Sequence, residues 1–303
     1  MTTHFKSIVY CINLKITSFT YTNKKMKTTS KRLRRASIAA TFFLIGQLPI
    51  TAYATSGQVS LTPSLLNFNY VEYDETGKQI DKEYGTLPGI ELAIKNTNEY
   101  GVYLEAGISV HRARLNYEGG IIGTDIPHQT QTDEELTHFH LTVGNTFGDQ
   151  DKPLDVYLYL SKERWDRKIQ PSYNAAAGGY VAGYYEKYQW SKVGIGIKQT
   201  LPTQGANQVF FGVKLFRINS PSMTAYLDFA GLGSPTFSLH EKTGFRTILG
   251  WRTRHRAQFD YGITAVYEQY KFGASAVNTA NGLREPDSKT KRLGLQLDIL
   301  IPF

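Results

Sequence analysis

The chain has 303 residues, a formal net charge of +8 and one cysteine. Nine of its 34 lysines and arginines, but none of its 26 acidic residues, lie within residues 1–54, so residues 55–303 carry 25 basic and 26 acidic side chains. This balance removes the support that net charge would give to a nucleic-acid-binding function. Cys11 also lies in the first segment, which leaves residues 55–303 without a disulfide framework or a cysteine-based site.

Residues 1–54 are interpreted as an upstream extension and a secretory signal peptide. Met26 is a possible second start and is followed by five lysines and arginines, an apolar run of about a dozen residues and then Ala52-Tyr53-Ala54. A basic head, a short apolar stretch and an A-x-A site are typical of a cleaved signal peptide. We therefore expect cleavage after Ala54 and one exported domain, residues 55–303.

Ten segments of this domain alternate apolar and polar residues with period two, as β-strands with one apolar face do. In residues 102–111, for example, Val102 and Leu104 lie on one face, whereas Tyr103 and Glu105 lie on the other. Polar stretches rich in Gly, Asn and Asp separate the segments. The predicted strands lie near 66–70, 90–94, 102–111, 139–143, 154–160, 193–198, 209–215, 245–251, 259–267 and 292–303.

The connections between these strands alternate in length, which is typical of an up-and-down membrane β-barrel with short periplasmic turns and longer outer loops. Long polar loops are predicted at 118–133, 163–183, 219–243 and 273–289, with shorter turns between them. The sequence therefore predicts an all-β fold, a transmembrane antiparallel barrel of ten strands. A hidden hairpin within 219–243 would raise the number to twelve.

The polar face of the strands combines charged side chains with glycines, which favours a barrel lumen over the surface of a soluble sandwich. Glycine on neighbouring strands gives long side chains space, but on a solvent-facing surface it would only weaken the strands. Tyr184, Tyr188 and Trp190 lie on the phase opposite to Val193 and Ile195, so either a bulge shifts the register or these rings point into the lumen. The predicted lumen residues are Glu105, His111, His138, His140, Asp155, Lys192, Arg246, Arg252, Asp260, Glu268, Arg292 and Asp298.

Tyrosines near the strand ends are interpreted as aromatic girdles at the membrane interfaces, where amphipathic rings are favoured. The tyrosines so assigned are Tyr70, Tyr73, Tyr100, Tyr117, Tyr184, Tyr185, Tyr188, Tyr267 and Tyr270.

With these features the chain resembles the small bacterial outer-membrane β-barrel proteins of porin-like class, over the whole of residues 55–303. In that class the last strand resembles a targeting signal that the barrel-assembly machinery reads. The residues that carry this signal here are Leu295, Leu297, Ile299, Ile301 and Phe303. The resemblance implies an outer-membrane location and contact with outer-membrane lipid and lipopolysaccharide.

The sequence holds no Gly-x-Ser-x-Gly or HExxH motif. His138 and His140 share the lumen phase, and His111 and Glu105 share it on the preceding strand. Three imidazoles and a carboxylate could bind a metal or transfer protons, but hydrogen-bonded filling of a polar lumen is the preferred interpretation. No metal or cofactor is therefore expected, and lumen salt bridges are expected to leave a narrow ten-stranded interior plugged or barely open.

The stretch "ERWDRKIQ", residues 163–170, is expected to begin a long loop. We interpret Trp165 as an interface anchor, with contact of Arg164, Arg167 and Lys168 to lipopolysaccharide phosphates as the alternative. The preferred function is a structural, adhesive or narrow porin-like barrel. A barrel enzyme acting on lipid A, phospholipid or peptide at the outer rim is the alternative, and a soluble secreted β-protein is the third hypothesis.

Overall fold

The computed structural model describes residues 56–303 except 123, 125, 150–151, 204 and 254–258, so the predicted signal peptide lies outside the described residues. No helix in this part of the chain has the length and apolar character needed to cross a membrane. The elements are β1 (Ser56–Tyr73), β2 (Gln79–Thr97), β3 (Val102–Gly120), β4 (Pro127–Phe147), β5 (Leu154–Ile169), β6 (Ser172–Asn174), β7 (Gly179–Val181), β8 (Tyr185–Pro202), β9 (Asn207–Tyr226), the 3-10 helix η2 (Asp228–Ala230), β10 (Thr236–Ser238), β11 (Thr243–Thr253), β12 (Asp260–Phe272) and β13 (Asp287–Pro302).

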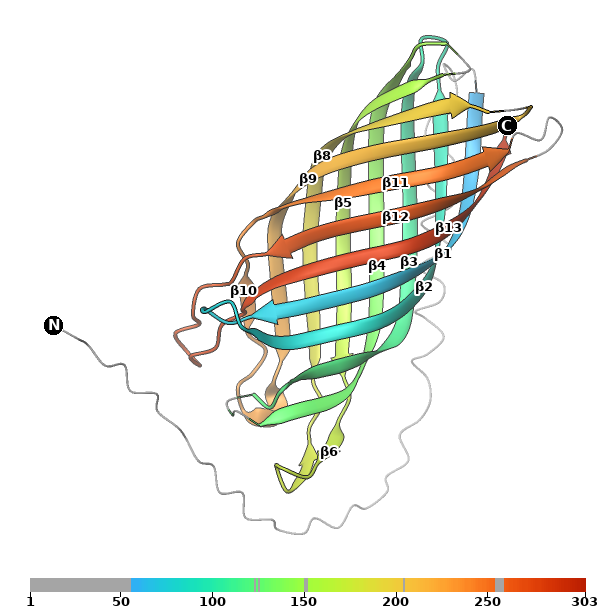
Figure 1. Cartoon of the computed structure of the whole chain (residues 1–303). Helices are drawn as coiled ribbons and strands as arrows, with labels where there is room; N and C mark the ends of the chain where they lie inside the picture. Colours follow the sequence, from blue (N-terminus) through green and yellow to red (C-terminus); the bar gives the residue numbers. More distant parts are fainter. Residues whose placement is uncertain (1–55, 123, 125, 150–151, 204, 254–258) are drawn as a thin grey trace, which may run out of the picture. The chain divides into compact units, whose positions relative to one another are not determined.

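Ten long antiparallel strands form a closed barrel (Figure 1). Their order around the wall is β1-β2-β3-β4-β5-β8-β9-β11-β12-β13, and β13 pairs with β1 to close it. The prediction of ten rather than twelve strands is confirmed, because the only extra strand between β9 and β11 in the described residues, β10, pairs only with the C-terminal end of β9. The short strands β6 and β7 form a separate hairpin in the β5–β8 connection.

The strands extend well beyond the lengths expected from the sequence. Nine of the ten have 13 to 21 residues, and β11 has 11, whereas about 9–11 residues suffice to cross a bilayer. The predicted long loop at 118–133 is reduced to residues 121–126, because β3 and β4 continue through most of it. Polar residues can face outwards on a strand that stands above the membrane, so their appearance did not mark the strand ends.

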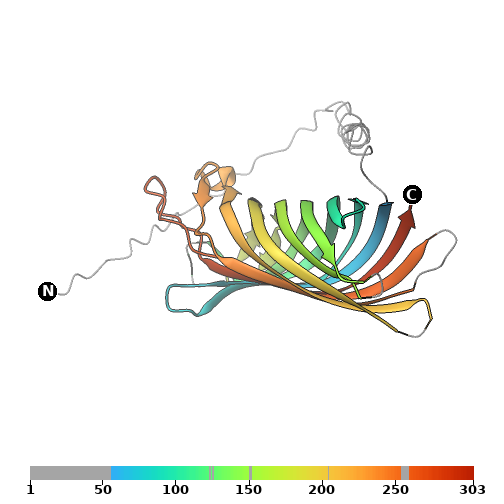
Figure 2. The same ribbon diagram turned by 90° about the horizontal axis from the view of Figure 1, so that it is seen from above.

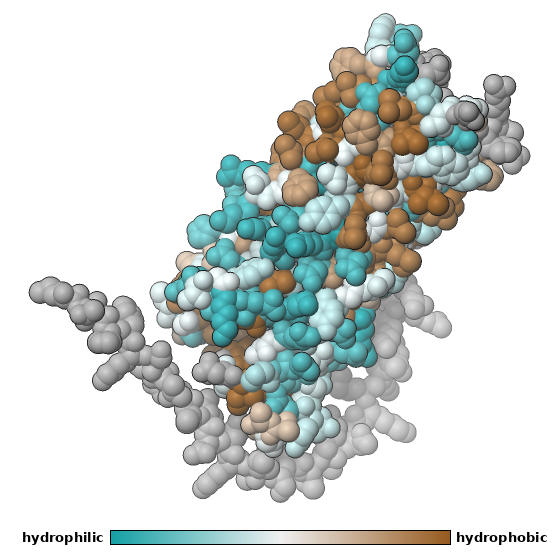
Figure 3. Space-filling model, in the orientation of Figure 1, coloured by the Kyte–Doolittle hydropathy of each residue, from teal (hydrophilic) through white to brown (hydrophobic). Residues whose placement is uncertain are grey.

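An apolar belt surrounds one half of the barrel. On the outer face of β5, Val156, Leu158 and Leu160 are exposed, and Lys162 and Arg164 continue the same face. In Figure 3 the hydrophobic side chains gather over the half that carries the C-terminus in Figure 1, and the other half is largely hydrophilic. The belt is therefore the membrane-spanning part of the wall, and the strands project beyond it.

The short turns identify the periplasmic side. The β2–β3 and β8–β9 turns span residues 98–101 and 203–206, and they lie at the same end as the start of β1 and the end of β13. The longer β5–β8, β9–β11 and β12–β13 connections lie at the opposite, outer end.

The only register shift next to Trp190 in the described residues is a bulge in β9, the neighbour of β8, and β8 itself continues without a break in alternation. Gln189 pairs with Ser222 and Ser191 pairs with Asn219, so two residues of β9 oppose one of β8. Ser220 in the bulge has a φ of 48°, and the residue after it is proline, which a bulge tolerates. β8 keeps its phase, and Tyr188 and Trp190 point into the lumen, which was one of the two sequence interpretations.

The strands curve around the lumen, as Figure 2 shows. Aromatic side chains fill the outer half of this lumen. Trp165 stacks on Tyr188 with ring centroids 4.7 Å apart and meets Tyr70 edge-on at 4.9 Å. The girdle interpretation is therefore wrong for Tyr70, Tyr117, Tyr188 and Tyr270, which are buried inside the barrel. The period-two alternation places these four side chains on the lumen face of their strands. The abundance of tyrosine near the predicted strand ends led instead to the interpretation as a membrane-interface girdle.

Candidate functional site

A cavity of about 230 Å³ occupies the lumen of the periplasmic half. It reaches close to the strand ends at Lys95 and Leu300, and its wall is mostly polar. Seven of the twelve predicted lumen residues line it: Glu105, His138, His140, Asp155, Arg246, Arg252 and Asp298. Glu268 lies outside the lining and forms a 3.9 Å ion pair with Arg246.

His138 and His140 lie side by side on this wall, as the alternation of β4 predicts. Their rings stack with centroids 5.3 Å apart. His138 Nε2 lies 2.6 Å from the Tyr159 hydroxyl, and His140 Nε2 lies 3.4 Å from Glu105 Oε1. His111 is separate from this pair and forms a 2.9 Å hydrogen bond with Ser64.

Glu91 of β2 takes the place that the sequence interpretation gave to His111. Ligand-capable atoms of Glu91, His138 and His140 all lie within 4.8 Å of one another. The residues come from strands separated by β3, and the sequence offered no signal for this proximity beyond a shared lumen phase.

An ionic layer crosses the middle of the lumen. Lys192 Nζ lies 2.5 Å from Glu163 Oε1 and 2.9 Å from Glu268 Oε1. Arg292 lies 3.4 Å and 3.3 Å from the same two carboxylates. Since β5 and β13 are five steps apart in a circle of ten strands, the Glu163–Arg292 contact spans the full diameter.

Four other predicted lumen residues lie toward the periplasmic end of the barrel. Asp155 forms a 3.2 Å ion pair with Lys198, and Asp298 accepts hydrogen bonds from Thr62 and Thr264. Arg252 lies over the Phe210 ring at 5.5 Å. Asp260 begins β12 on the phase of the buried Gly262 and Thr264, at the periplasmic end.

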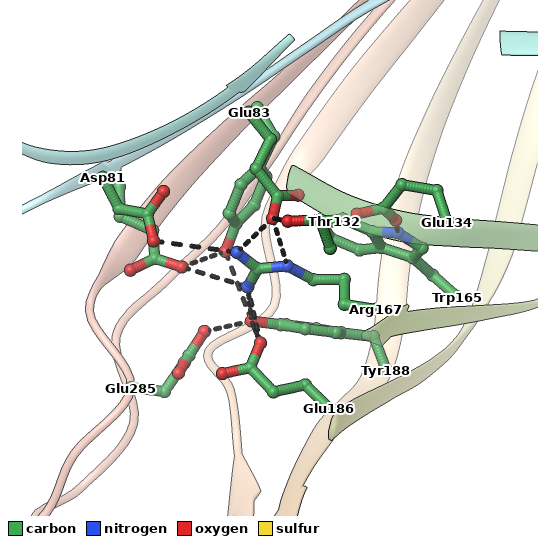
Figure 4. Close-up of polar contacts among 11 residues, drawn as sticks. Asp81, Glu83, Thr132, Glu134, Trp165, Arg167, Glu186, Tyr188 and Glu285 are labelled. Carbon is green, nitrogen blue, oxygen red and sulfur yellow. Dashed lines mark hydrogen bonds and ion pairs between the residues drawn. The ribbon is translucent and has the colours of Figure 1, made fainter. Parts of the chain in front are cut away.

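A second cluster, the Arg167 cluster, lies in the outer half above the aromatic layer (Figure 4). Arg167 is 1% exposed, and its guanidinium lies 2.5 Å from Glu186, 3.0 Å from Glu83 and 3.4 Å from Glu72. Asp81 lies 3.7 Å away. The other members are Tyr188, which donates to Glu285 at 2.5 Å, and Glu134, which accepts a hydrogen bond from the Trp165 indole.

Six carboxyl groups thus surround one guanidinium in a buried space, above the apolar belt. Outward neighbours at this level, such as Lys187 and Lys168, are polar, so the cluster lies outside the membrane-spanning part of the wall. Burial raises the pKa of Glu186 to about 7, against the opposing attraction of Arg167. Burial likewise raises the pKa of Glu72 and Glu285.

The sequence analysis missed this cluster and misplaced two of its residues. Trp165 is buried in the lumen rather than anchored at an interface, and Arg167 is not available to lipopolysaccharide. The signal was present, because the alternation of β5 continues past Leu160 and places Glu163, Trp165 and Arg167 on the lumen phase. A run of charged residues was instead taken as the start of a loop.

The structure also separates the lumen histidines from the outer rim. His138 lies opposite Ser109 of β3 and Glu163 of β5 in the strand register, within the membrane-spanning half. His138 and His140 are therefore too deep in the barrel for chemistry on lipid A at the outer rim. Nearer the outer end, His128 contacts Ser172 and Asn174, and His240 contacts the Ala274 carbonyl.

Comparison with known proteins supports the fold. No family model matches the chain, and no curated protein matches it. Among solved structures, the Escherichia coli outer-membrane protease OmpT superposes with a TM-score of 0.56 at 9% identity, covering 82% of this chain and 96% of OmpT. The Pseudomonas aeruginosa outer-membrane protein OprG matches with a TM-score of 0.36 at 12% identity, covering 83% and 97%.

The closed wall, its apolar belt and this likeness define a transmembrane antiparallel β-barrel. The chain has the fold of the small bacterial outer-membrane β-barrel proteins, as the sequence resemblance implied.

Proposed function

We propose that this protein is a sealed outer-membrane barrel of the structural and adhesive type, which presents its outer wall and loops as a contact surface. The observation that carries the proposal is the pair of layers across the lumen. The Glu163–Arg292 contact spans one diameter, and the Tyr70–Tyr188 hydroxyl contact of 3.4 Å joins β1 and β8, also five steps apart. Buried aromatic rings fill the space between these levels.

Conductance distinguishes a barrel with a sealed lumen from a narrow porin. Purified barrel reconstituted in planar bilayers should give no conductance steps above the bare bilayer, whereas an open porin measured alongside should give them. The fraction of folded barrel in the same preparation is checked by its heat-dependent gel mobility. Stable conductance steps from the folded barrel would overturn the sealed interpretation.

The β6–β7 hairpin supports the adhesive part of the proposal. It lies at the outer end in Figure 1 and carries Tyr173 and Tyr180, which are 62% and 83% exposed and pack edge-to-face at 5.7 Å. Exposed aromatic rings with few rotatable bonds are favoured at binding surfaces because they bury much area at low entropic cost.

Bacteria that display the wild-type barrel should adhere to surfaces or to one another more than bacteria that display Tyr173→Ser/Tyr180→Ser. Tyr100→Ser is the matched control, because Tyr100 is 76% exposed but lies on the periplasmic β2–β3 turn. Equal adhesion of all three strains at equal surface amounts would contradict the role of the hairpin.

We also propose that β13 is read by the barrel-assembly machinery. Four of its five alternating apolar residues are well exposed on the belt, and the same strand forms the closing seam with β1. We also propose that lipopolysaccharide binds the outward-facing lysines Lys271, Lys289 and Lys291 rather than the buried Arg167.

A further inference from the structure

Three side chains in the periplasmic cavity are arranged as the ligands of a metal ion. His138 and His140 project from β4 to the same side, and Glu91 projects from β2. Their ligand atoms lie within 4.8 Å of one another. Zn–N and Zn–O bonds of about 2.0–2.2 Å in a tetrahedral site place ligand atoms roughly 3.4 Å apart, so only small side-chain movements would bring these atoms to an ion.

Gly107 creates the space in which these residues meet. It lies on β3 between the two strands, paired with His140 on one side and Ala93 on the other. A Cβ at this position would lie 2.5 Å from the His140 ring and 2.8 Å from the Ala93 side chain. A larger residue would therefore push the imidazole away from β2, where Glu91 lies.

Two of the three groups have unused ligand atoms. His140 is 5% exposed, and its Nδ1 is buried without a hydrogen-bond partner in the described part of the chain. The Glu91 carboxylate likewise forms no hydrogen bond or ion pair with another described residue. Because a buried polar atom without a partner is costly, the orphaned nitrogen is itself an observation that points to a ligand.

The surroundings match those of a metal-bound histidine. The other ring nitrogen of His140 faces Glu105 at 3.4 Å, and metal-binding histidines commonly donate this second N–H to a carboxylate, which fixes the ring. His138 Nε2 contacts the Tyr159 hydroxyl at 2.6 Å, and its Nδ1, which would bind the ion, has a long 3.5 Å contact with the Ser109 hydroxyl that the ion would replace. Glu91 supplies a negative charge to the ion and Glu105 a second one beside it, on a cavity wall that also carries basic side chains, namely Lys95, Lys198, Lys214, Arg246 and Arg252.

We propose that Glu91, His138 and His140 bind a divalent transition-metal ion of the Zn²⁺ class in the periplasmic half of the lumen. Imidazole nitrogen with one carboxylate suits this class better than Mg²⁺ or Ca²⁺, which prefer oxygen ligands. The cavity reaches the periplasmic strand ends, whereas the ionic layer of Lys192, Glu163, Glu268 and Arg292 lies between the site and the outer end of the barrel. The ion therefore enters from the periplasm. This inference is independent of the proposed adhesive function.

The test is a titration of purified, tag-free, refolded barrel with Co²⁺, followed by visible absorption and then by Zn²⁺ competition. Wild type should bind one equivalent, with absorption bands that added Zn²⁺ removes. His140→Ala should weaken binding at least a hundredfold. Glu105→Gln, which changes the partner of the ligand, should weaken it about ten- to a hundredfold.

His111→Ala is the matched control, because His111 is also a buried lumen imidazole but bonds Ser64 outside the cluster. It should bind within about twofold of wild type. Glu91→Gln keeps the size of the side chain and tests the site even if His140→Ala does not fold, as judged by gel mobility.

The proposal is overturned if wild type shows no stoichiometric binding, or if Glu91→Gln binds as wild type does. Equal loss in His111→Ala would also overturn it, by placing the ion elsewhere. Under any of these results the histidines are the hydrogen-bonded filling that we first inferred from the sequence.

Discussion

Gly57 and Phe303 exchange two main-chain hydrogen bonds across the seam of the barrel. The Gly57 N–H donates to the Phe303 carbonyl at 3.0 Å, and the Phe303 N–H donates to the Gly57 carbonyl at 2.9 Å. Closing the barrel removes the unpaired edges of its first and last strands, which a membrane does not tolerate. The aromatic ring itself is 64% exposed, so the backbone of Phe303 closes the wall while its side chain remains accessible.

Because the backbone of Phe303 closes the barrel and its side chain is exposed, we predict that Phe303→Ala impairs assembly in cells without greatly destabilising the folded barrel. The variant should lower the amount of folded protein in the outer membrane severalfold, yet its unfolding free energy after refolding in detergent should fall by less than about 1 kcal/mol, as for an exposed side chain. Phe259→Ala, at another exposed ring near the same end, is the control and should assemble normally. Equal assembly of the two variants would contradict the proposed role of the last strand.

Arg167 is predicted to be the residue on which the outer layer depends most. Arg167→Ala leaves several buried carboxyl groups without their shared partner, and breaking a buried ion pair in this way costs about 3–5 kcal/mol. Arg164→Ala is the control, because Arg164 lies on the outward face of the same strand and is exposed, and its pair with Asp166 is worth about 1 kcal/mol or less. Urea unfolding followed by tryptophan fluorescence measures both. Similar losses in the two variants would contradict the central role of Arg167.

The sequence could predict the ten strands and most lumen residues because lipid on one side and a polar lumen on the other impose strict alternation. It could not predict the strand ends, since residues such as Lys162 and Arg164 face water from a strand as readily as from a loop. The approach of Glu91 to His140 was also out of reach. It depends on the register of three strands and on the missing side chain of Gly107, neither of which a local pattern fixes.

The Arg167 cluster predicts that the barrel is more stable in mild acid than in mild base. The pKa of Glu186 is raised to about 7, so this residue contributes stability while it is protonated, and the contribution is lost as the pH rises through about 7. The unfolding free energy should therefore be higher at pH 5.5 than at pH 8, by on the order of 2 kcal/mol. Glu186→Gln should reduce this difference. An unchanged pH dependence in the variant would show that other groups cause it.

Three lysines on neighbouring strands form a basic patch on the outer wall, at Lys271, Lys289 and Lys291. Lys271 and Lys289 pair directly in the β12–β13 register. Like charges in such a pair repel, and none of the three has an ion-pair partner among the described residues. The apolar belt begins directly below at Leu293. We therefore propose that this patch meets the phosphates of lipopolysaccharide in the outer leaflet.

Lys271→Gln/Lys291→Gln is therefore predicted to weaken lipopolysaccharide binding by about 2 kcal/mol, or roughly thirtyfold, at about 1 kcal/mol for each lysine near an anionic lipid surface. Binding is measured as the rise in unfolding temperature when lipopolysaccharide is added to detergent-solubilised barrel, over a range of lipid and salt concentrations. Lys78→Gln, an exposed lysine in the β1–β2 turn, controls for the loss of charge alone. The rise should diminish in the double variant, persist in the control and decrease with salt, because charge attraction is screened. Equal stabilisation of all three proteins would remove the patch as the phosphate site.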